Sequence, residues 1–211
     1  MSDFINTIDV LGDEAVIDSF IMKTITEFSD NKLTEVRGTA FQECTALTSV
    51  NLPEVKSGVK FAGCTSLKTV NLPKVEAIPN YCFENANAIT ELTLPRLTRV
   101  PYGGLKQMKS CKLIDLPCVT YIDQYGFQDD RALESVILRS ETICTLNNVN
   151  AFQSTNINSG TVYIYVPAAL VESYKVATNW SNYADQFRAI EDYTVDGTVM
   201  GELIGQMLYS A

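Results

Sequence analysis

Histidine, the side chain that most often carries acid–base catalysis, is absent from the 211 residues of this chain. It is the base in Ser-His-Asp and Cys-His nucleophile systems, and it is a ligand in most catalytic zinc sites. Carboxylates, lysines and cysteines are the groups that remain for such chemistry. The sequence therefore predicts a protein that is not an enzyme, and we assign it no catalytic residue and expect no cofactor.

The six cysteines do not have the spacing of a metal or redox site. No two of them form C-x-x-C, the pattern of zinc ribbons and thioredoxin-like centres. Cys44 and Cys64 stand at equivalent positions of two similar segments, FQECTALTSVNLPEV and FAGCTSLKTVNLPKV. Such a pair suits either a disulfide or a column of small buried thiols, and we favour the thiols. The cysteines are Cys44, Cys64, Cys82, Cys111, Cys118 and Cys144.

Acidic residues gather at Asp129, Asp130 and Glu134. They do not follow the D-x-D-x-D-G arrangement of a calcium-binding loop, so we expect a solvated turn and no metal site. The YGG segment at Tyr102–Gly104 is too short for a phosphate-binding loop and is interpreted as a turn.

Composition narrows the class of partner. Apolar residues make up 46% of the chain and charged residues 19%, which predicts a folded domain. The net charge of −9 argues against binding to nucleic acid or to anionic lipid, because both need a basic surface. No apolar run is long enough to insert into a membrane, and the acidic start MSDFINTIDVLGDEAVIDSF is not a secretory signal. We therefore expect synthesis in a cytoplasm. Either a signal is missing from this sequence, or the protein leaves the cell another way, for example inside a virus particle.

The two similar segments belong to a longer internal repeat. Its period of 20 to 25 residues predicts a leucine-rich-repeat solenoid, in which coils stack because one coil cannot bury its apolar stripe alone. The coil beginning at Phe41 is two residues short between Val55 and Phe61, which predicts a shorter loop with the apolar stripe intact. The first apolar residue of each copy is Phe41, Phe61, Phe83, Leu105, Phe127 or Phe152.

Each copy carries the signals of a short strand and a turn. In L-x-x-V-x-L the last apolar residues alternate with polar ones, as in a strand, and the proline that follows ends it. The strands are expected to stack into a parallel sheet, and segments such as FQECTAL suit a helical or 3₁₀ turn. Leu52, Leu72, Leu94 and Leu116 should then form a single buried row.

The chain divides into four regions on this pattern. Residues 1–32 are predicted to form an N-terminal cap, 33–160 an α/β solenoid of about six irregular coils, and 161–193 a strand-helix cap. Both caps are expected to contain short helical segments. Trp180 is expected to seal the C-terminal end of the core rather than to stack on a ligand. Residues 194–211 form an apolar tail, which either folds back on the solenoid or docks on a partner.

The repeat F-x-x-C-x-x-L-x-x-V-x-L-P resembles the BspA-like leucine-rich repeats, which are also described from treponemal surface proteins. The segment DEAVIDSFIMKTITEFSDNKLTEV resembles the leader of such proteins in phages of gut Firmicutes. YIYVPAALVESYKVATNWSNYADQFRAIEDY, at Tyr163–Tyr193, resembles the closing segment found on such repeats in gut Firmicutes and their phages. The resemblance implies a non-enzymatic interaction or adhesion protein, most like the members encoded by phages or prophages.

For this chain the resemblance implies a virion component, such as a receptor-binding, tail or decoration protein. It would be made in the host cytoplasm, assemble as a homo-oligomer and contact a host surface or other virion proteins. The alternative is a fragment of a bacterial cell-surface adhesin that lacks its signal and anchor.

Exposed rows on the solenoid are the candidate contact surfaces for a protein partner. One row follows the strand positions, a second follows the prolines, and the apolar tail offers a third surface. No aromatic row is evident in the repeat, so we expect no carbohydrate-stacking face. The candidate contact residues are Asn51, Asn71, Lys74, Thr93, Arg96, Asp115, Leu203, Met207, Leu208 and Tyr209.

Overall fold

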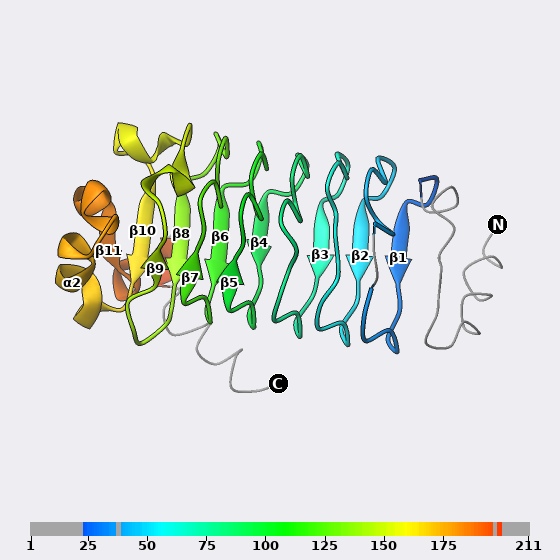
Figure 1. Cartoon of the computed structure of the whole chain (residues 1–211), viewed down its shortest axis with the longest axis horizontal. Helices are drawn as coiled ribbons and strands as arrows, with labels where there is room; N and C mark the ends of the chain where they lie inside the picture. Colours follow the sequence, from blue (N-terminus) through cyan, green and yellow to red (C-terminus); the bar gives the residue numbers. More distant parts are fainter. Residues whose placement is uncertain (1–22, 37–38, 196–197, 200–211) are drawn as a thin grey trace.

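Each copy of the repeat makes one coil of a solenoid in the computed structural model, which describes residues 23–36, 39–195 and 198–199. One strand from each coil lies in a row along the molecule (Figure 1). The row contains, in chain order, β1 (Glu27–Ser29), β2 (Ser49–Asn51), β3 (Thr69–Asn71), β4 (Glu91–Thr93), β6 (Leu113–Leu116), β8 (Ser135–Leu138), β10 (Tyr163–Val166) and β11 (Phe187–Ala189).

All the pairs that form between neighbouring strands of this row are parallel. They form two sheets, β1-β2-β3 and β11-β10-β8-β6-β4. Equivalent residues face each other across the pairs, for example Val50 opposite Val70 and Ile114 opposite Val136. The predicted parallel sheet is therefore confirmed, with an interruption between β3 and β4 that the sequence did not predict.

A second row of very short strands was also not predicted. It consists of β5 (Arg99–Val100), β7 (Tyr121–Ile122) and β9 (Thr145–Leu146), which pair in parallel. Val100 and Ile122 are buried and lie five residues before the next anchor. Two-residue strands leave no alternating pattern in the sequence, which is why the apolar positions alone did not identify them.

The core runs without a break along the solenoid. Leu52, Leu72, Leu94, Leu116 and Leu138 are all buried, and Leu116 faces Leu138 across paired strands, so the predicted leucine row is confirmed. The anchor rings stack beside it. The ring centroids of Phe41 and Phe61 are 5.3 Å apart, those of Phe61 and Phe83 are 5.4 Å apart, and those of Phe127 and Phe152 are 4.8 Å apart.

The FQECTAL-type segments form tight turns rather than regular helices. The amide of Cys44 donates to Phe41 O at 3.3 Å and that of Leu47 donates to Cys44 O at 3.1 Å. Between them Glu43 has a φ of 60°, a left-handed value that a helix cannot accommodate. The same left-handed residue recurs at Asn85, Gln107, Asp129 and Ser154, so the turn is a property of the repeat.

The short coil closes as predicted, with its apolar stripe intact. Val55, Val59 and Phe61 are fully buried. Gly58 allows the shorter path, because a Cβ at this position would lie 1.8 Å from Val36 O. Its φ of 84° is also a conformation that other residues rarely adopt.

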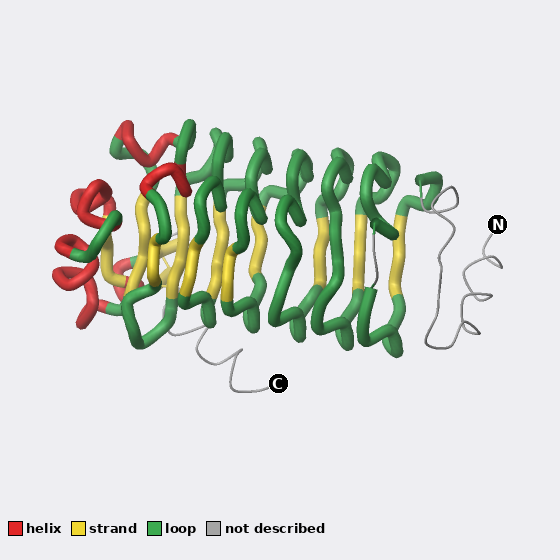
Figure 2. Tube along the Cα trace, in the orientation of Figure 1, coloured by secondary structure: helices red, strands yellow, loops and turns green. Residues whose placement is uncertain are grey.

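Helical segments gather at the C-terminal end, as Figure 2 shows in red. After η2 (Val149–Phe152) and η3 (Asn156–Ser159) come η4 (Ala168–Leu170), α2 (Val171–Val176), η5 (Trp180–Gln186) and η6 (Ile190–Asp192). β12 (Thr194–Val195) then pairs antiparallel with β13 (Thr198–Val199). Trp180 is 1% exposed and packs on Phe152, Tyr174 and Phe187, so its predicted sealing role is confirmed.

At the other end, β1 lies within the range expected for the N-terminal cap. Most of that cap, and the tail residues Leu203, Met207, Leu208 and Tyr209, lie outside the described residues. Within the part that the structure describes, no helix has the length and apolar character needed to span a membrane.

Candidate interaction surface

The strand row presents a ladder of side-chain amides. Asn71 Nδ2 donates to Asn51 Oδ1 at 2.7 Å, and Asn51 Nδ2 donates to Ser29 Oγ at 2.9 Å. The three side chains stand at equivalent positions of β1, β2 and β3, and each is wholly or partly exposed. Two of the candidate contact residues, Asn51 and Asn71, are thus brought together, with their amides partly used within the ladder.

The row that follows the prolines carries charge. Lys74 Nζ lies 2.6 Å from Glu54 Oε2, and both side chains are about two-fifths exposed, at 39% and 40%. Arg96 is the next member of this row and is exposed, as is Thr93 on β4. A partner could therefore reach both rows, although the Lys74 charge is shared with Glu54.

Asp115 was a candidate contact residue, and the structure contradicts this. Asp115 is 2% exposed, and Arg139 binds it through two nitrogens, with Nη2 2.9 Å from Oδ2. Burial raises the pKa of Asp115, while the neighbouring guanidinium acts in the opposite direction. Arg139 occupies the position where earlier coils have proline, and its long side chain covers the carboxylate.

The chain itself contributes aromatic cover to this end of the strand face. Ile137 of β8 faces the same side as Asp115 and is fully buried. After β11 the chain turns back toward β10, and the ring centroids of Tyr193 and Tyr165 of β10 are 4.7 Å apart. Arg188 lies 4.6 Å over the ring of Tyr163. The open part of the strand face is therefore the part nearer the N-terminus.

The acidic turn at Asp129 and Asp130 also differs from expectation. Asp130 is fully buried, because it occupies the third position after its anchor, which Cys44 and Cys64 fill in earlier coils. Its Oδ1 accepts a hydrogen bond from the Met108 amide at 2.8 Å, whereas no described residue hydrogen-bonds to Oδ2. Burial raises the pKa of Asp130 well above its ordinary value.

The cysteines are free, and all but Cys118 are buried. Cys64 Sγ donates to Phe41 O at 2.9 Å and Cys82 Sγ donates to Val59 O at 3.1 Å, so the thiols bind the carbonyls of the preceding coil. Burial raises the pKa of Cys82 and of Cys144, the latter to about 12. The favoured reading of buried thiols is confirmed, and the raised pKa values make Cys82 and Cys144 poor nucleophiles at neutral pH.

An aromatic row exists where none was expected. The rings of Tyr81 and Tyr102 are 5.5 Å apart, and those of Tyr102 and Tyr125 are 5.4 Å apart, each pair edge to face. All three side chains are partly exposed. Lys106 Nζ lies 4.9 Å over the Tyr81 ring. We call Tyr81, Tyr102 and Tyr125 the tyrosine row.

A glycine makes the tyrosine row possible. Gly103 has a φ of 58°, and a Cβ at this position would come within 2.9 Å of the Tyr81 ring. Gly103 stands at the position of the repeat that Tyr81 and Tyr125 occupy in their coils, so Tyr102, one residue earlier, supplies the ring of this coil. Tyr81 and Tyr125 lie two residues before their anchors and Tyr102 lies three before its own, so the row is out of step with the repeat.

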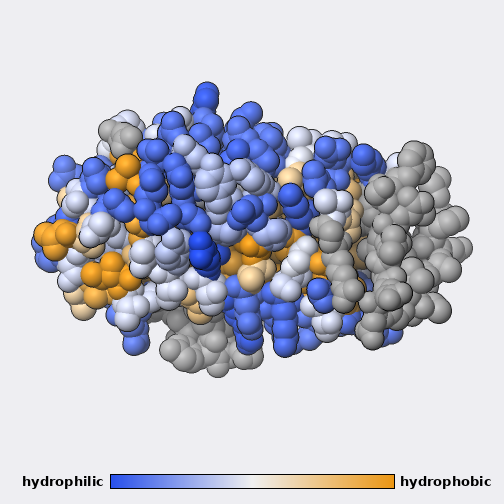
Figure 3. Space-filling view, viewed as in Figure 1, coloured by the Kyte–Doolittle hydropathy of each residue, from blue (hydrophilic) through white to orange (hydrophobic). Residues whose placement is uncertain are grey.

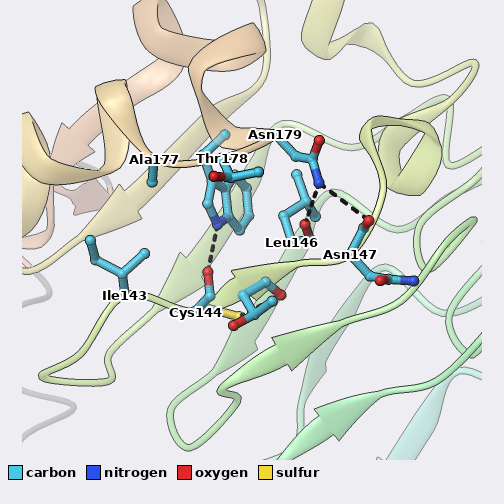
Figure 4. A pocket seen from close by; sticks show the side chains of 9 residues that line it. Ile143, Cys144, Leu146, Asn147, Ala177, Thr178 and Asn179 are labelled. Atoms are coloured by element: carbon cyan, nitrogen blue, oxygen red, sulfur yellow. Dashed lines mark hydrogen bonds between the residues drawn. The ribbon is translucent and has the colours of Figure 1, made fainter.

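A hollow of about 430 Å³ lies between β9 and the C-terminal cap (Figure 4). Side chains of the cap bind the backbone there. Trp180 Nε1 donates to Cys144 O at 2.6 Å, and Asn179 Nδ2 donates to Leu146 O at 2.7 Å. Because the Trp180 ring is buried, this hollow has no aromatic platform for a ligand.

The side of the molecule seen in Figure 3 is mainly hydrophilic, with apolar patches at the end that carries α2. The most exposed large apolar side chain among the described residues is Val176 at 81%, on α2. Within the same residues, no group of three or more acidic or cysteine side chains is placed to hold a metal ion.

The chain matches the family model described as BspA type leucine rich repeat region, in six copies over residues 10–60 and 57–168. A solved leucine-rich repeat protein of T. pallidum is 25% identical, with a TM-score of 0.50 over 54% of this chain and 58% of that one. A leucine-rich cell surface protein of Faecalibacterium prausnitzii A2-165 is 23% identical, with a TM-score of 0.50 over 67% of this chain and 43% of that one. The chain thus spans less than two thirds of either solved protein. No curated protein has significant sequence similarity to it.

Proposed function

The chain belongs to the BspA-type leucine-rich repeat family, and we propose that it is a non-enzymatic interaction or adhesion module of a phage or prophage particle. It would act as a receptor-binding, tail or decoration protein that contacts a host surface or other virion proteins. A virion is its proposed location, and symmetric copies of the chain are its proposed assembly.

The observation that carries the interaction role is the tyrosine row. Three partly exposed rings lie in contact across three successive coils. Tyrosine supplies a large, rigid contact area with a polar tip, which is why it is enriched where proteins bind one another. The amide ladder of Ser29, Asn51 and Asn71 adds a second repeating surface on the strand face.

The particle assignment is supported by two segments that flank the repeats. The leader DEAVIDSFIMKTITEFSDNKLTEV and the closing segment at Tyr163–Tyr193 resemble those of phage-associated members. Mass spectrometry of purified, induced particles tests the assignment. We expect peptides of this protein at a fixed ratio to a capsid or tail protein, and absence from the particles would refute it.

A bacterial cell-surface adhesin is the second candidate, because one protein of similar fold is described as a cell surface protein. Surface proteolysis of intact producing cells separates the two. Cleavage of this protein on uninduced cells would favour the adhesin, whereas protection until particle release would favour the virion component.

The contact surface is tested by one substitution with a matched control. Tyr102→Ala removes the central ring of the tyrosine row, and Tyr121→Ala removes a partly exposed tyrosine from outside it. Truncation of an interface tyrosine that forms a hot spot costs about 2 kcal/mol or more of binding, or roughly thirtyfold. We expect that loss in adhesion of the purified protein to host cells for Tyr102→Ala alone. Equal binding by both variants would exclude the tyrosine row as the contact surface.

A further inference from the structure

The row of parallel strands is interrupted once among the described coils, between β3 and β4. These strands are neighbours in the row (Figure 1), yet they belong to separate sheets. The same two coils stay bonded elsewhere. The amide of Gly63 donates to Glu84 O at 2.7 Å, and the amide of Thr98 donates to Glu76 O at 3.2 Å. The coils therefore separate only on their strand side.

The interruption leaves the amide of the residue that follows β3 without its usual acceptor. At the junction before it, the Leu52 amide donates to Asn71 O at 3.0 Å, and at the junction after it, the Leu94 amide donates to Asp115 O at 3.2 Å. Leu72 stands at the same position of the repeat. Its amide has no hydrogen bond to any described residue.

On the β4 side of the interruption, a main-chain amide also lacks its usual acceptor. The Lys68 amide donates to Thr48 O at 2.9 Å, and the Lys112 amide donates to Thr90 O at 2.7 Å. Thr90 is the equivalent residue between them, and its amide donates to none of the described residues. Both walls of the interruption thus carry free main-chain groups that are paired at the neighbouring junctions.

A groove of about 440 Å³ occupies the interruption. This lies within the range of about 300–1,000 Å³ that is usual for ligand sites. Val70 of β3 lines it and is partly buried against the core. Lys68 stands on one wall and Glu91 on the other, both exposed, so the two walls carry opposite charges.

The edge of the second strand row, at β9, differs in that its main-chain groups are hydrogen-bonded. At β9 the Cys144 amide donates to the Tyr174 hydroxyl at 2.8 Å. The carbonyls of Cys144 and Leu146 accept from Trp180 and Asn179, as described above. Side chains of the cap thus take the place of a next strand. No described side chain does so for the amides of Leu72 and Thr90.

We infer that the groove between β3 and β4 binds an extended segment of a partner protein, which pairs with the free main-chain groups of the two strands. Unpaired strand edges are templates for another extended backbone, and pockets beside them select its side chains. Val70 offers an apolar contact, and the opposite charges of Lys68 and Glu91 suit a segment without net charge. The inference rests on the proposed function and specifies the kind of partner segment.

Hydrogen exchange of the full-length protein tests this, with the capped peptide LTSVNLP as the probe. Its sequence is that of residues 47–53, so it is uncharged and has the alternation that the solenoid's own strands use. We expect the peptide to slow exchange of the Leu72 and Thr90 amides by about tenfold or more at saturation, since each becomes hydrogen-bonded. The Leu94 amide, which is already bonded, should not change.

Two controls make the result specific. A version of the peptide methylated on alternate backbone nitrogens loses its donors, and it should bind about tenfold more weakly or worse. Thr93→Arg adds a bulky charge to the groove and should weaken binding, whereas Thr45→Arg, an exposed turn position of another coil, should not.

Several results would overturn the inference. One is slow exchange of Leu72 and Thr90 in the free protein, equal to that of Leu94. If that protection depends on protein concentration, a second copy fills the groove. If deletion of residues 200–211 removes it, the chain's own tail does. Equal binding of the methylated peptide, or no protection by either peptide, also contradicts main-chain pairing. Host-cell adhesion that Thr93→Arg leaves intact would count against the groove alone and leave the proposed function standing.

Discussion

Asp130 is a buried acid, and one of its oxygens has no hydrogen-bond partner among the described residues, so its charge state bears directly on the stability of the coil that contains it. Its raised pKa means that the folded protein holds this proton to a higher pH than the unfolded chain does. The unfolded state therefore loses the proton first as pH rises. This residue's contribution to stability is most favourable below the ordinary aspartate pKa and is lost as pH climbs toward the folded pKa.

Asp130→Asn should therefore be more stable than the wild type at neutral pH, because asparagine keeps an acceptor for the Met108 amide and cannot ionise. Urea unfolding between pH 4 and pH 8 measures this. The variant should lose less stability as pH rises than the wild type does. Asp129→Asn, at a less buried neighbour, is the control. Parallel pH profiles for wild type and Asp130→Asn would contradict the assignment.

The Arg139–Asp115 pair gives a second prediction at this scale. Arg139→Ala removes the partner of a carboxylate that is 2% exposed, and breaking a buried ion pair in this way costs about 3–5 kcal/mol. The double variant Asp115→Ala/Arg139→Ala should recover a large part of that loss, because no buried charge remains. Chemical denaturation of the wild type, Asp115→Ala, Arg139→Ala and the double variant measures the coupling. A double variant no more stable than Arg139→Ala would show that the pair is not coupled.

At the scale of the element, buried and exposed side chains alternate along strand β4 and the residue that follows it. Leu94 follows the strand and is fully buried, and Thr93 beside it is exposed. Leu94→Ala should cost about 2–5 kcal/mol, since it leaves a cavity in the leucine row. Thr93→Ala should stay within about 0.5 kcal/mol of the wild type. Equal effects of the two substitutions in thermal or urea unfolding would contradict the leucine row.

Elements defined by the repeat could be predicted from the sequence, and elements that depend on distant contacts could not. The segment LTSVNLP contains the alternation and the proline that define β2, so its strand was predictable. The burial of Asp115 depends on Arg139, twenty-four residues away, and this contact has no signal in the spacing. The tyrosine row was missed because Tyr102 is one position out of step with Tyr81 and Tyr125.

On the scale of the whole molecule, the coils form a stack whose surface rows extend over several repeats. Buried apolar residues form one continuous cluster across the described coils. Trp180 of the C-terminal cap closes one end of it. A stack of this kind presents extended surfaces, which suit large partners better than small ligands. The proposed adhesion role uses this property, and the groove between β3 and β4 is a local departure from it.

Distances between spin labels on successive coils test the stack most directly. In a Cys118→Ser background the remaining native cysteines are buried, so introduced cysteines can be labelled selectively. One label is placed at Glu134, and the second at Thr26, Thr48 or Lys68, which are partly or fully exposed on three successive coils. The stack predicts that the measured distance shortens by about 5 Å at each step, the spacing of neighbouring strands. Distances that do not shorten in that order would contradict the solenoid and the functions proposed from it.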